Sequence, residues 1–225
     1  MSTERNPVKT RTLALVAVLA LALVGCTATP TPEPSSPPAT PDVPVAASVV
    51  VSADKVTVLD EDGTEISSYD YFAEDAQRAI TELTYIFGFR AELTEQEAQS
   101  HAPRTTIHVW NGFELSEYHD VTPSSPEVNS FAVAVTTADV NGVEISAEGG
   151  VAVGTEELAA APVAYRHVPN NGEVDPVDLY YLDETPVEIA GSPDYEPAAL
   201  SVEAWVTGKD RLVTRMYAPM RNWGP

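Results

Sequence analysis

The sequence predicts an α+β fold: antiparallel sheets built from hairpins, with one main amphipathic helix and short accessory helices. Three observations lead to this class. Apolar residues alternate with polar ones and run into glycine-containing turns, one segment has helical periodicity, and the hairpins do not repeat as propeller blades would. The folded domain is expected at 46–225, a length that suits one domain or two halves, 46–125 and 126–225.

Hairpins are predicted wherever an alternating segment meets a turn pair. Val56 and Val58 alternate with polar residues before Asp62-Gly63, and the segment 105–115 turns at Asn111-Gly112. Such pairs adopt positive φ at low cost, as two-residue hairpin turns require. The segment 131–146 adds alternating apolar residues on one face and is expected to supply further strands.

The register of the last hairpin stays open. A turn at Gly208-Lys209 would group Trp205 with Leu212, whereas a turn at Lys209-Asp210 would group Val206 with Val213. A slip of one residue exchanges the two faces of a strand, so the choice decides which side chains are buried.

The main helix is expected within 73–89. Its apolar positions follow the spacing i, i+3, i+4, i+7, acidic residues stand in the first turn, and Gly88 ends it. The apolar positions are Ala76, Ala79, Ile80, Leu83 and Phe87, and the acidic ones are Glu74 and Asp75. This face should pack on the sheet.

Two accessory helices are predicted from capping patterns. In the segment 93–100, Thr94 and Glu97 can form a capping box, in which each residue bonds a backbone N–H of the other. In the segment 154–162, Thr155 can cap a helix that Pro162 ends.

The first 25 residues have the outline of a secretory signal. Arg5, Lys9 and Arg11 precede an uninterrupted apolar run, Leu13–Val24. Because a helix needs about 20 apolar residues to cross the hydrocarbon core, this run is too short for a permanent span. We expect it to be removed.

The single cysteine follows this run directly. Leu23-Val24-Gly25-Cys26 resembles the lipobox of bacterial lipoproteins, which implies cleavage after Gly25 and a diacylglyceryl group, with palmitate-type chains, on the Cys26 thiol. Two acyl chains hold a protein to a bilayer durably, whereas one holds it marginally. The alternative is an ordinary secretory signal with an incidental cysteine, and acylation of the new amino terminus stays open.

A proline-rich segment connects this cysteine to the domain. Between Thr27 and Val45 there are seven prolines and six Ser or Thr residues, with no apolar side chain larger than valine. Such a segment cannot bury enough surface to offset its ordering entropy. Residues 26–45 are therefore predicted to be a disordered linker that reaches up to about 60 Å.

The charge of the chain excludes some partners. The formal net charge is −22 at pH 7, from 34 acidic and 12 basic side chains, and loss of 1–25 would make it about −24. Nucleic acid and anionic lipid headgroups would be repelled, so the membrane is expected as a partner only through the anchor at Cys26.

No catalytic motif is present. The sequence lacks G-x-S-x-G, H-E-x-x-H, a phosphate-binding loop and G-x-G-x-x-G. The four histidines, His101, His108, His119 and His167, match no familiar metal spacing. We therefore expect no cofactor, no transition metal and no catalytic residue that a motif can identify.

One candidate binding surface is found at the Asn111-Gly112 hairpin. There Trp110 would stand opposite Phe113, and His108 would share their face. The functional interpretation makes this face a ligand platform; the alternative makes it core packing.

The turns Trp110–Phe113 and Gly150–Thr155 resemble recurring turns of uncharacterised secreted lipoproteins of actinobacteria. This resemblance implies a source and no activity. The expected function is a membrane-anchored, extracytoplasmic binding or interaction module. The alternative is a cell-envelope hydrolase that uses carboxylates no motif reveals, and the ligand and oligomeric state stay open.

Overall fold

The computed structural model describes residues 45–73, 76–100, 102–156, 165–168, 177–187 and 199–222, with the backbone alone for 165–168 and 222. All of these residues belong to one compact unit, Asp42–Pro225. The predicted signal segment, Cys26 and most of the linker lie outside the described residues.

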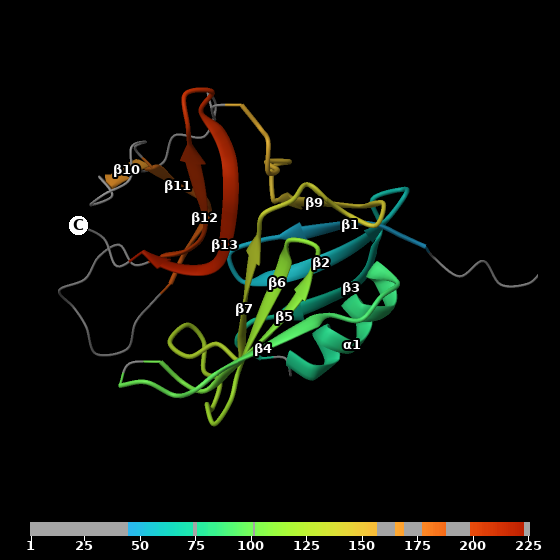
Figure 1. Ribbon diagram of the computed structural model, residues 1–225, viewed down its shortest axis with the longest axis vertical. Coiled ribbons are helices and arrows are strands. Elements are labelled where there is room, and N and C mark those ends of the chain that lie inside the picture. The colour runs from blue at the N-terminus through green and yellow to red at the C-terminus, as the bar shows by residue number, and fades with distance from the viewer. Residues whose placement is uncertain are drawn as a thin grey trace, which may run out of the picture. The chain divides into compact units, whose positions relative to one another are not determined.

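The described part of the chain is mostly β-structure, so the predicted α+β class is wrong. It contains thirteen strands and one helix (Figure 1). A five-stranded sheet has the order β3 (Glu65–Asp70), β2 (Lys55–Asp60), β1 (Ala46–Val51), β9 (Val143–Ala147) and β8 (Asp139–Val140). An eight-stranded sheet has the order β10 (Tyr165–Val168), β11 (Val177–Pro186), β12 (Ala199–Thr207), β13 (Leu212–Asn222), β7 (Phe131–Val135), β6 (Phe113–Tyr118), β5 (Thr105–Trp110) and β4 (Glu92–Gln96).

The accessory helix predicted at 93–100 is absent because its residues form the edge strand β4. Leu93 pairs with His108, and Gln96 pairs with Thr105, in an antiparallel ladder. Every residue of β4 is exposed. A helix here would have had no apolar stripe to bury, whereas the strand gains backbone hydrogen bonds along β5.

The second accessory helix, predicted at 154–162, does not begin where the sequence indicates. Gly154 donates its backbone N–H to Val213, and the N–H of Val213 is donated to Thr155, which fixes this turn against β13. Glu156 then forms an isolated bridge with Leu212. The rest of the predicted helix, from 157, lies outside the described residues.

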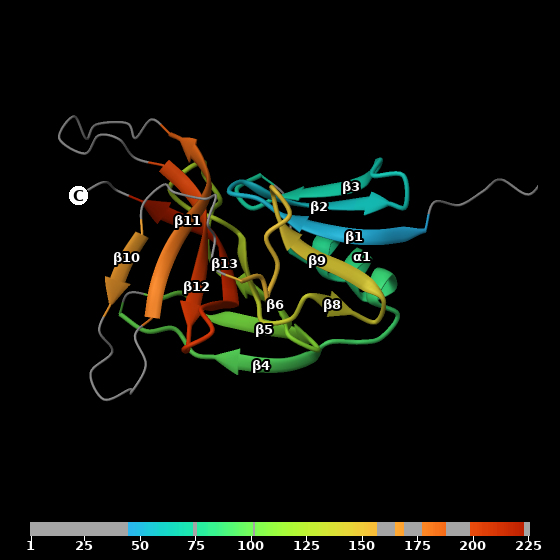
Figure 2. The same cartoon turned by 90° about the horizontal axis from the view of Figure 1, so that it is seen from above.

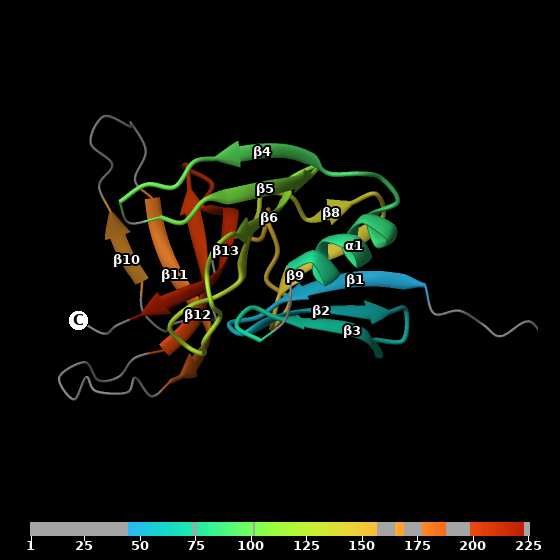
Figure 3. The ribbon, with the colours of Figure 1, turned by 90° about the horizontal axis from the view of Figure 1, so that it is seen from below.

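The main helix is confirmed, but it begins at Ala76 and its first turn holds no acidic residue; Glu74 and Asp75 lie outside the described residues. α1 spans Ala76–Phe87 and buries Ala76, Ala79, Leu83 and Phe87, four of the five apolar positions expected. Gly88 ends it with φ +77°, and its N–H is shared between the carbonyl oxygens of the last turn. Tyr69 of β3 donates to Glu82 of α1, and Phe87 packs on aromatic rings of the other sheet, so α1 lies between the two sheets (Figure 3).

The turn at Asn111-Gly112 is confirmed, whereas at Asp62-Gly63 only Gly63 has positive φ, and Asp60 N–H donates to Thr64 across a three-residue loop. Asn111 and Gly112 have φ of +47° and +98°, and the strands pair Trp110 with Phe113. In the last hairpin Val206 pairs with Val213, the second of the two registers that the sequence left open. The Asn111-Gly112 turn therefore specified the register of its own hairpin. The register of the last hairpin was not specified by its turn residues and depends on tertiary packing.

Both sheets combine strands from before and after residue 125. β1 pairs in parallel with β9, although the two strands are far apart in sequence. The eight-stranded sheet likewise joins β4–β6 to β10–β13 through the pairing of β7 with β13. The described residues consequently do not divide at the boundary between 46–125 and 126–225.

The eight-stranded sheet bends strongly between β13 and β6. Figure 2 shows β11–β13 at a steep angle to β4–β6. Register shifts interrupt β12–β13 between Ser201 and Glu203 and between Trp205 and Val206. Such bulges increase local twist and bend a strand. As a result, one face of β13 looks toward the outer face of β5 and β6.

Candidate functional site

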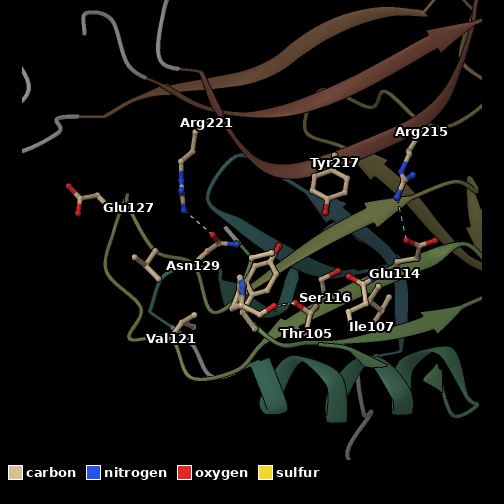
Figure 4. A pocket seen from close by; sticks show the side chains of 15 residues that line it. Thr105, Ile107, Glu114, Ser116, Val121, Glu127, Asn129, Arg215, Tyr217 and Arg221 are labelled. Carbon is tan, nitrogen blue, oxygen red and sulfur yellow. Dashed lines mark hydrogen bonds and ion pairs between the residues drawn. The ribbon is translucent and has the colours of Figure 1, made fainter. Parts of the chain in front are cut away.

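A polar groove occupies the space inside this bend. Its volume is about 560 Å³, and its walls are β5 and β6 on one side and β13 on the other (Figure 4). Its charged and aromatic lining comprises Glu114, Tyr118, Glu127, Arg215, Tyr217 and Arg221. Strand alternation explains this composition. Met216 and Ala218 of β13 face the core, and the residues that alternate with them point into the groove.

Arg215 is held between two aromatic rings at one end of the groove. Its guanidinium carbon lies 5.9 Å from the Trp205 ring centroid and 5.6 Å from that of Tyr217. Its Nη2 donates to Glu114 Oε2 at the long distance of 3.4 Å. Its Nε is buried and has no hydrogen-bond partner among the described residues. Arg215 is therefore rigidly placed but incompletely neutralised.

A buried carboxylate of the neighbouring strand β12 supports this arrangement. Glu203 is 7% exposed, and its Oε1 accepts a hydrogen bond of 2.6 Å from Trp205 Nε1. This bond fixes the indole ring against which Arg215 stacks. Glu203 is thus a positioning residue for the groove.

Arg221 stands at the other end, where its closest partner is neutral. Its Nη2 donates to Asn129 Oδ1 at 3.0 Å, a contact that joins residues 92 positions apart. Burial lowers the pKa of Arg221, and the negative charge of Glu127 opposes this shift. The side chain of Tyr118 is hydrogen-bonded to Tyr217 and Asn129, and burial raises its pKa, so it stays a neutral phenol.

Two arginines outside the groove have closer carboxylate partners. Arg78 Nε lies 3.2 Å from Glu82 Oε1, and Arg211 Nη1 lies 2.5 Å from Asp178 Oδ2. In so acidic a chain, close pairing of a guanidinium with a carboxylate is the expected outcome. Arg215 has one carboxylate contact of 3.4 Å and Arg221 has a neutral partner, so other N–H groups of both guanidinium groups can donate to an anion.

His108, Trp110 and Phe113, which the sequence analysis gave as a candidate binding surface, are buried. Trp110 and Phe113 are 0% exposed and His108 is 8% exposed. Phe87 of α1 covers them, with ring centroids 5.8 Å from Trp110 and 5.4 Å from Phe113. The ligand-platform interpretation is therefore wrong, because a helix from another part of the chain packs on this face; the core-packing alternative describes it.

The sequence did contain a signal for the groove. In β13, Arg215 and Tyr217 alternate with Met216 and Ala218, which are fully buried. This alternation marks a strand with one core face and one cationic, aromatic face. The opposite wall could not be inferred, since β6 is brought near β13 by pairing through β7.

The carboxylates of the groove do not face each other. Figure 4 shows Glu114 beside Arg215 and Glu127 at the opposite end, toward Arg221. A glycosidase mechanism needs two carboxylates on either side of one bond, about 5–9.5 Å apart. Within the described residues, moreover, no group of three or more His, Cys, Asp or Glu side chains is placed to hold a metal ion.

The two histidines whose side chains are described have different partners. His108 Nε2 lies 3.2 Å from Glu117 Oε2, and the His119 ring nitrogen Nε2 lies 2.7 Å from Thr106 Oγ1. His101 and the side chain of His167 lie outside the described residues.

Together these features define a mostly-β, two-sheet domain with a polar groove inside the bend of its larger sheet. Comparisons with protein-family models, curated proteins and solved structures find no match for this chain. No helix in the described ranges has the length and apolarity needed to span a membrane.

Proposed function

We propose that this protein is a lipoprotein of the extracytoplasmic face of the cell membrane, anchored through Cys26, whose domain binds an anionic ligand in the groove. The observation that carries the binding function is the pair Arg215 and Arg221, which line one groove: Arg215 has a single 3.4 Å contact with Glu114 and a buried Nε without a partner among the described residues, and Arg221 donates to the neutral Asn129. Burial of such groups is costly unless an anion completes their hydrogen bonds.

The spacing of the arginines sets the size of the ligand. Arg215 and Arg221 are six residues apart on β13, so at 3.3 Å per residue they are at most about 20 Å apart. Tyr217 lies between them (Figure 4). An extended chain that carries carboxylates along its length fits both ends and can lie across the tyrosine ring.

Binding is favoured over the alternative of a cell-envelope hydrolase. The groove carboxylates, Glu114 and Glu127, are each associated with an arginine and lie at opposite ends. Neither is placed to act with the other on a single bond. The hydrolase therefore has no observation in its favour in this groove.

The groove is tested with fluorescein-labelled hexaglutamate, about 20 Å long when extended. Since the protein's net charge of −22 repels anions in general, binding of this probe would require a local cationic site. We expect binding at low ionic strength, measured by anisotropy, and no binding of labelled hexaglutamine. Arg215→Ala and Arg221→Ala should each weaken binding about 10- to 100-fold, the value of one or two hydrogen bonds to a charged group.

Arg78→Ala is the matched control, because it removes the same charge from α1, away from the groove. It should leave the affinity for hexaglutamate nearly unchanged. Equal losses in all three variants would indicate a general charge effect, and absence of binding by the wild type would rule out the anion-binding groove.

The anchor is tested separately by Cys26→Ala in the full-length chain. We expect the variant to leave the membrane fraction or to accumulate as an uncleaved precursor, because the acylated residue is lost. Ser36→Ala, in the linker, should fractionate like the wild type. Mass spectrometry of the mature wild type should find a diacylglyceryl adduct on Cys26; an unmodified thiol there would disprove the anchor.

A further inference from the structure

The two ends of the groove carry charge, and the part between them is neutral. Arg215 and Glu114 stand at one end, and Arg221 and Glu127 stand at the other (Figure 4). Among the described residues, no further Lys, Arg, His, Asp or Glu lines the groove. A ligand with densely spaced charges would meet both carboxylates as well as both arginines, whereas widely spaced carboxylates can each meet one arginine.

Hydroxyl and amide groups line the groove in addition to these charges. The neutral polar residues of the lining are Gln96, Thr105, Ser116, Tyr118, Asn129 and Tyr217. Ser116 of β6 is half-buried and makes no side-chain hydrogen bond within the described ranges, and Tyr217 of β13 lies on the other wall (Figure 4). Such groups both donate and accept hydrogen bonds, as the hydroxyls of a ligand require.

Aromatic and aliphatic surface accompanies these polar groups. The Tyr217 ring lies between the two arginines, and the guanidinium carbon of Arg215 is 5.6 Å from its centroid (Figure 4). Ile107 of β5 adds an apolar side chain to the opposite wall. A tyrosine offers an apolar ring together with a hydroxyl. A sugar ring has the matching composition, because it carries C–H groups on its faces and hydroxyls around its edge.

The backbone of the groove walls is already paired. β5 lies between β4 and β6, β6 lies between β5 and β7, and β13 lies between β12 and β7. The groove therefore presents side chains of interior strands and no free sheet edge. Extended peptides gain affinity by pairing their amide groups with an edge strand, which these walls do not provide. A ligand whose polar groups are hydroxyls and carboxylates has no need of such an edge.

We propose that the ligand of the groove is an acidic polysaccharide, a chain of hydroxyl-bearing sugar rings in which some rings carry a carboxylate. This inference rests on the anion-binding function proposed above and names the class of its ligand. The carboxylates accept hydrogen bonds from Arg215 and Arg221, and the sugar hydroxyls between them bond to Ser116 and Tyr217. One sugar ring packs its C–H face against Tyr217.

Anisotropy of two fluorescein-labelled probes with the full-length protein tests the ligand class. One probe is tetragalacturonate, and the other is a six-residue peptide of four glutamates and two glutamines, which matches its charge and approximate extended length. We expect tetragalacturonate to bind about 10-fold more tightly, the value of one or two hydrogen bonds between neutral groups. Its methyl ester, which keeps the hydroxyls and loses the charges, should bind much more weakly than the acid.

Ser116→Ala and Tyr217→Phe test recognition of the sugar hydroxyls. Each removes one hydroxyl and no charge, and Tyr217→Phe keeps the ring beside Arg215. Each should weaken binding of tetragalacturonate about 3- to 10-fold. Each should leave the affinity for the peptide nearly unchanged, which also shows that the groove stays folded. Ser68→Ala is the matched control, because it removes a hydroxyl from β3 of the other sheet, and it should change neither affinity.

The possible failures are distinguishable. If the peptide binds and tetragalacturonate binds no more tightly, the polysaccharide assignment is overturned while the anion-binding groove stands. The same conclusion follows if Ser116→Ala and Tyr217→Phe weaken the binding of both probes equally. If neither probe binds the wild-type protein, the proposed binding function fails, and the polysaccharide assignment fails with it.

Discussion

Phe87→Ala is expected to lower the free energy of unfolding by about 3–5 kcal/mol, the range for a fully buried phenylalanine. Phe87 is 0% exposed and contacts the rings of Trp110 and Phe113. It ties α1 to the eight-stranded sheet, so its loss leaves a cavity where no neighbouring backbone can collapse easily. Since domains are stable by only about 5–15 kcal/mol, much of the margin would be lost.

Tyr85→Ala provides the matched control for this prediction. Tyr85 lies in the same helix but is 84% exposed, so the same type of truncation should change stability by about 0.5 kcal/mol or less. Urea unfolding followed by circular dichroism measures both variants. Similar losses in the two would mean that Phe87 does not hold the helix to the sheet.

Gly112→Ala is expected to destabilise the domain by about 2–5 kcal/mol. Gly112 has φ of +98°, where an L-residue pays about 1–2 kcal/mol. A Cβ atom there would also lie 2.9 Å from Thr136 Oγ1 and 3.2 Å from Thr137 Cβ, so it adds an overpacking cost of about 1–3 kcal/mol. The carbonyl of Gly112 accepts the N–H of Thr136 at 2.7 Å, which prevents easy separation.

Gly63→Ala measures the conformational cost of positive φ at a position where the added Cβ atom causes no steric clash. Gly63 also has positive φ, +75°, but a Cβ atom there would meet nothing within 4 Å. The expected loss is therefore about 1–2 kcal/mol, the conformational cost alone. Thermal melts of the two variants give the comparison. A loss at Gly63 as large as that at Gly112 would show that contact with Thr136 and Thr137 is unimportant.

The confirmed sequence predictions rest on interactions within about a dozen residues. The Asn111-Gly112 pair specified a hairpin because few other residues adopt positive φ in both turn positions. The apolar spacing of α1 identified the side that is buried, and Gly88 marked its end. Such signals need no knowledge of the rest of the chain.

The wrong predictions concern segments whose structure depends on contacts with distant parts of the chain. The capping residues Thr94 and Glu97 favoured a helix locally, but pairing with β5 made Glu92–Gln96 an edge strand. For the face of Trp110 the sequence left a ligand platform and core packing as alternatives, because nothing in the hairpin indicates that Phe87 covers it. In both cases a partner from another segment outweighed a weak local preference.

By itself, the sequence determined the turns, the main helix and the acidity of the chain, and it predicted a lipid anchor at Cys26. The tertiary structure decided which faces meet. It brought Arg215 within 3.4 Å of Glu114, 101 residues away, and Ala53 within 2.7 Å of Asp183. The physical reason is that hydrogen-bonded turns and helical spacing are local, whereas strand order, sheet bending and burial depend on contacts between distant segments.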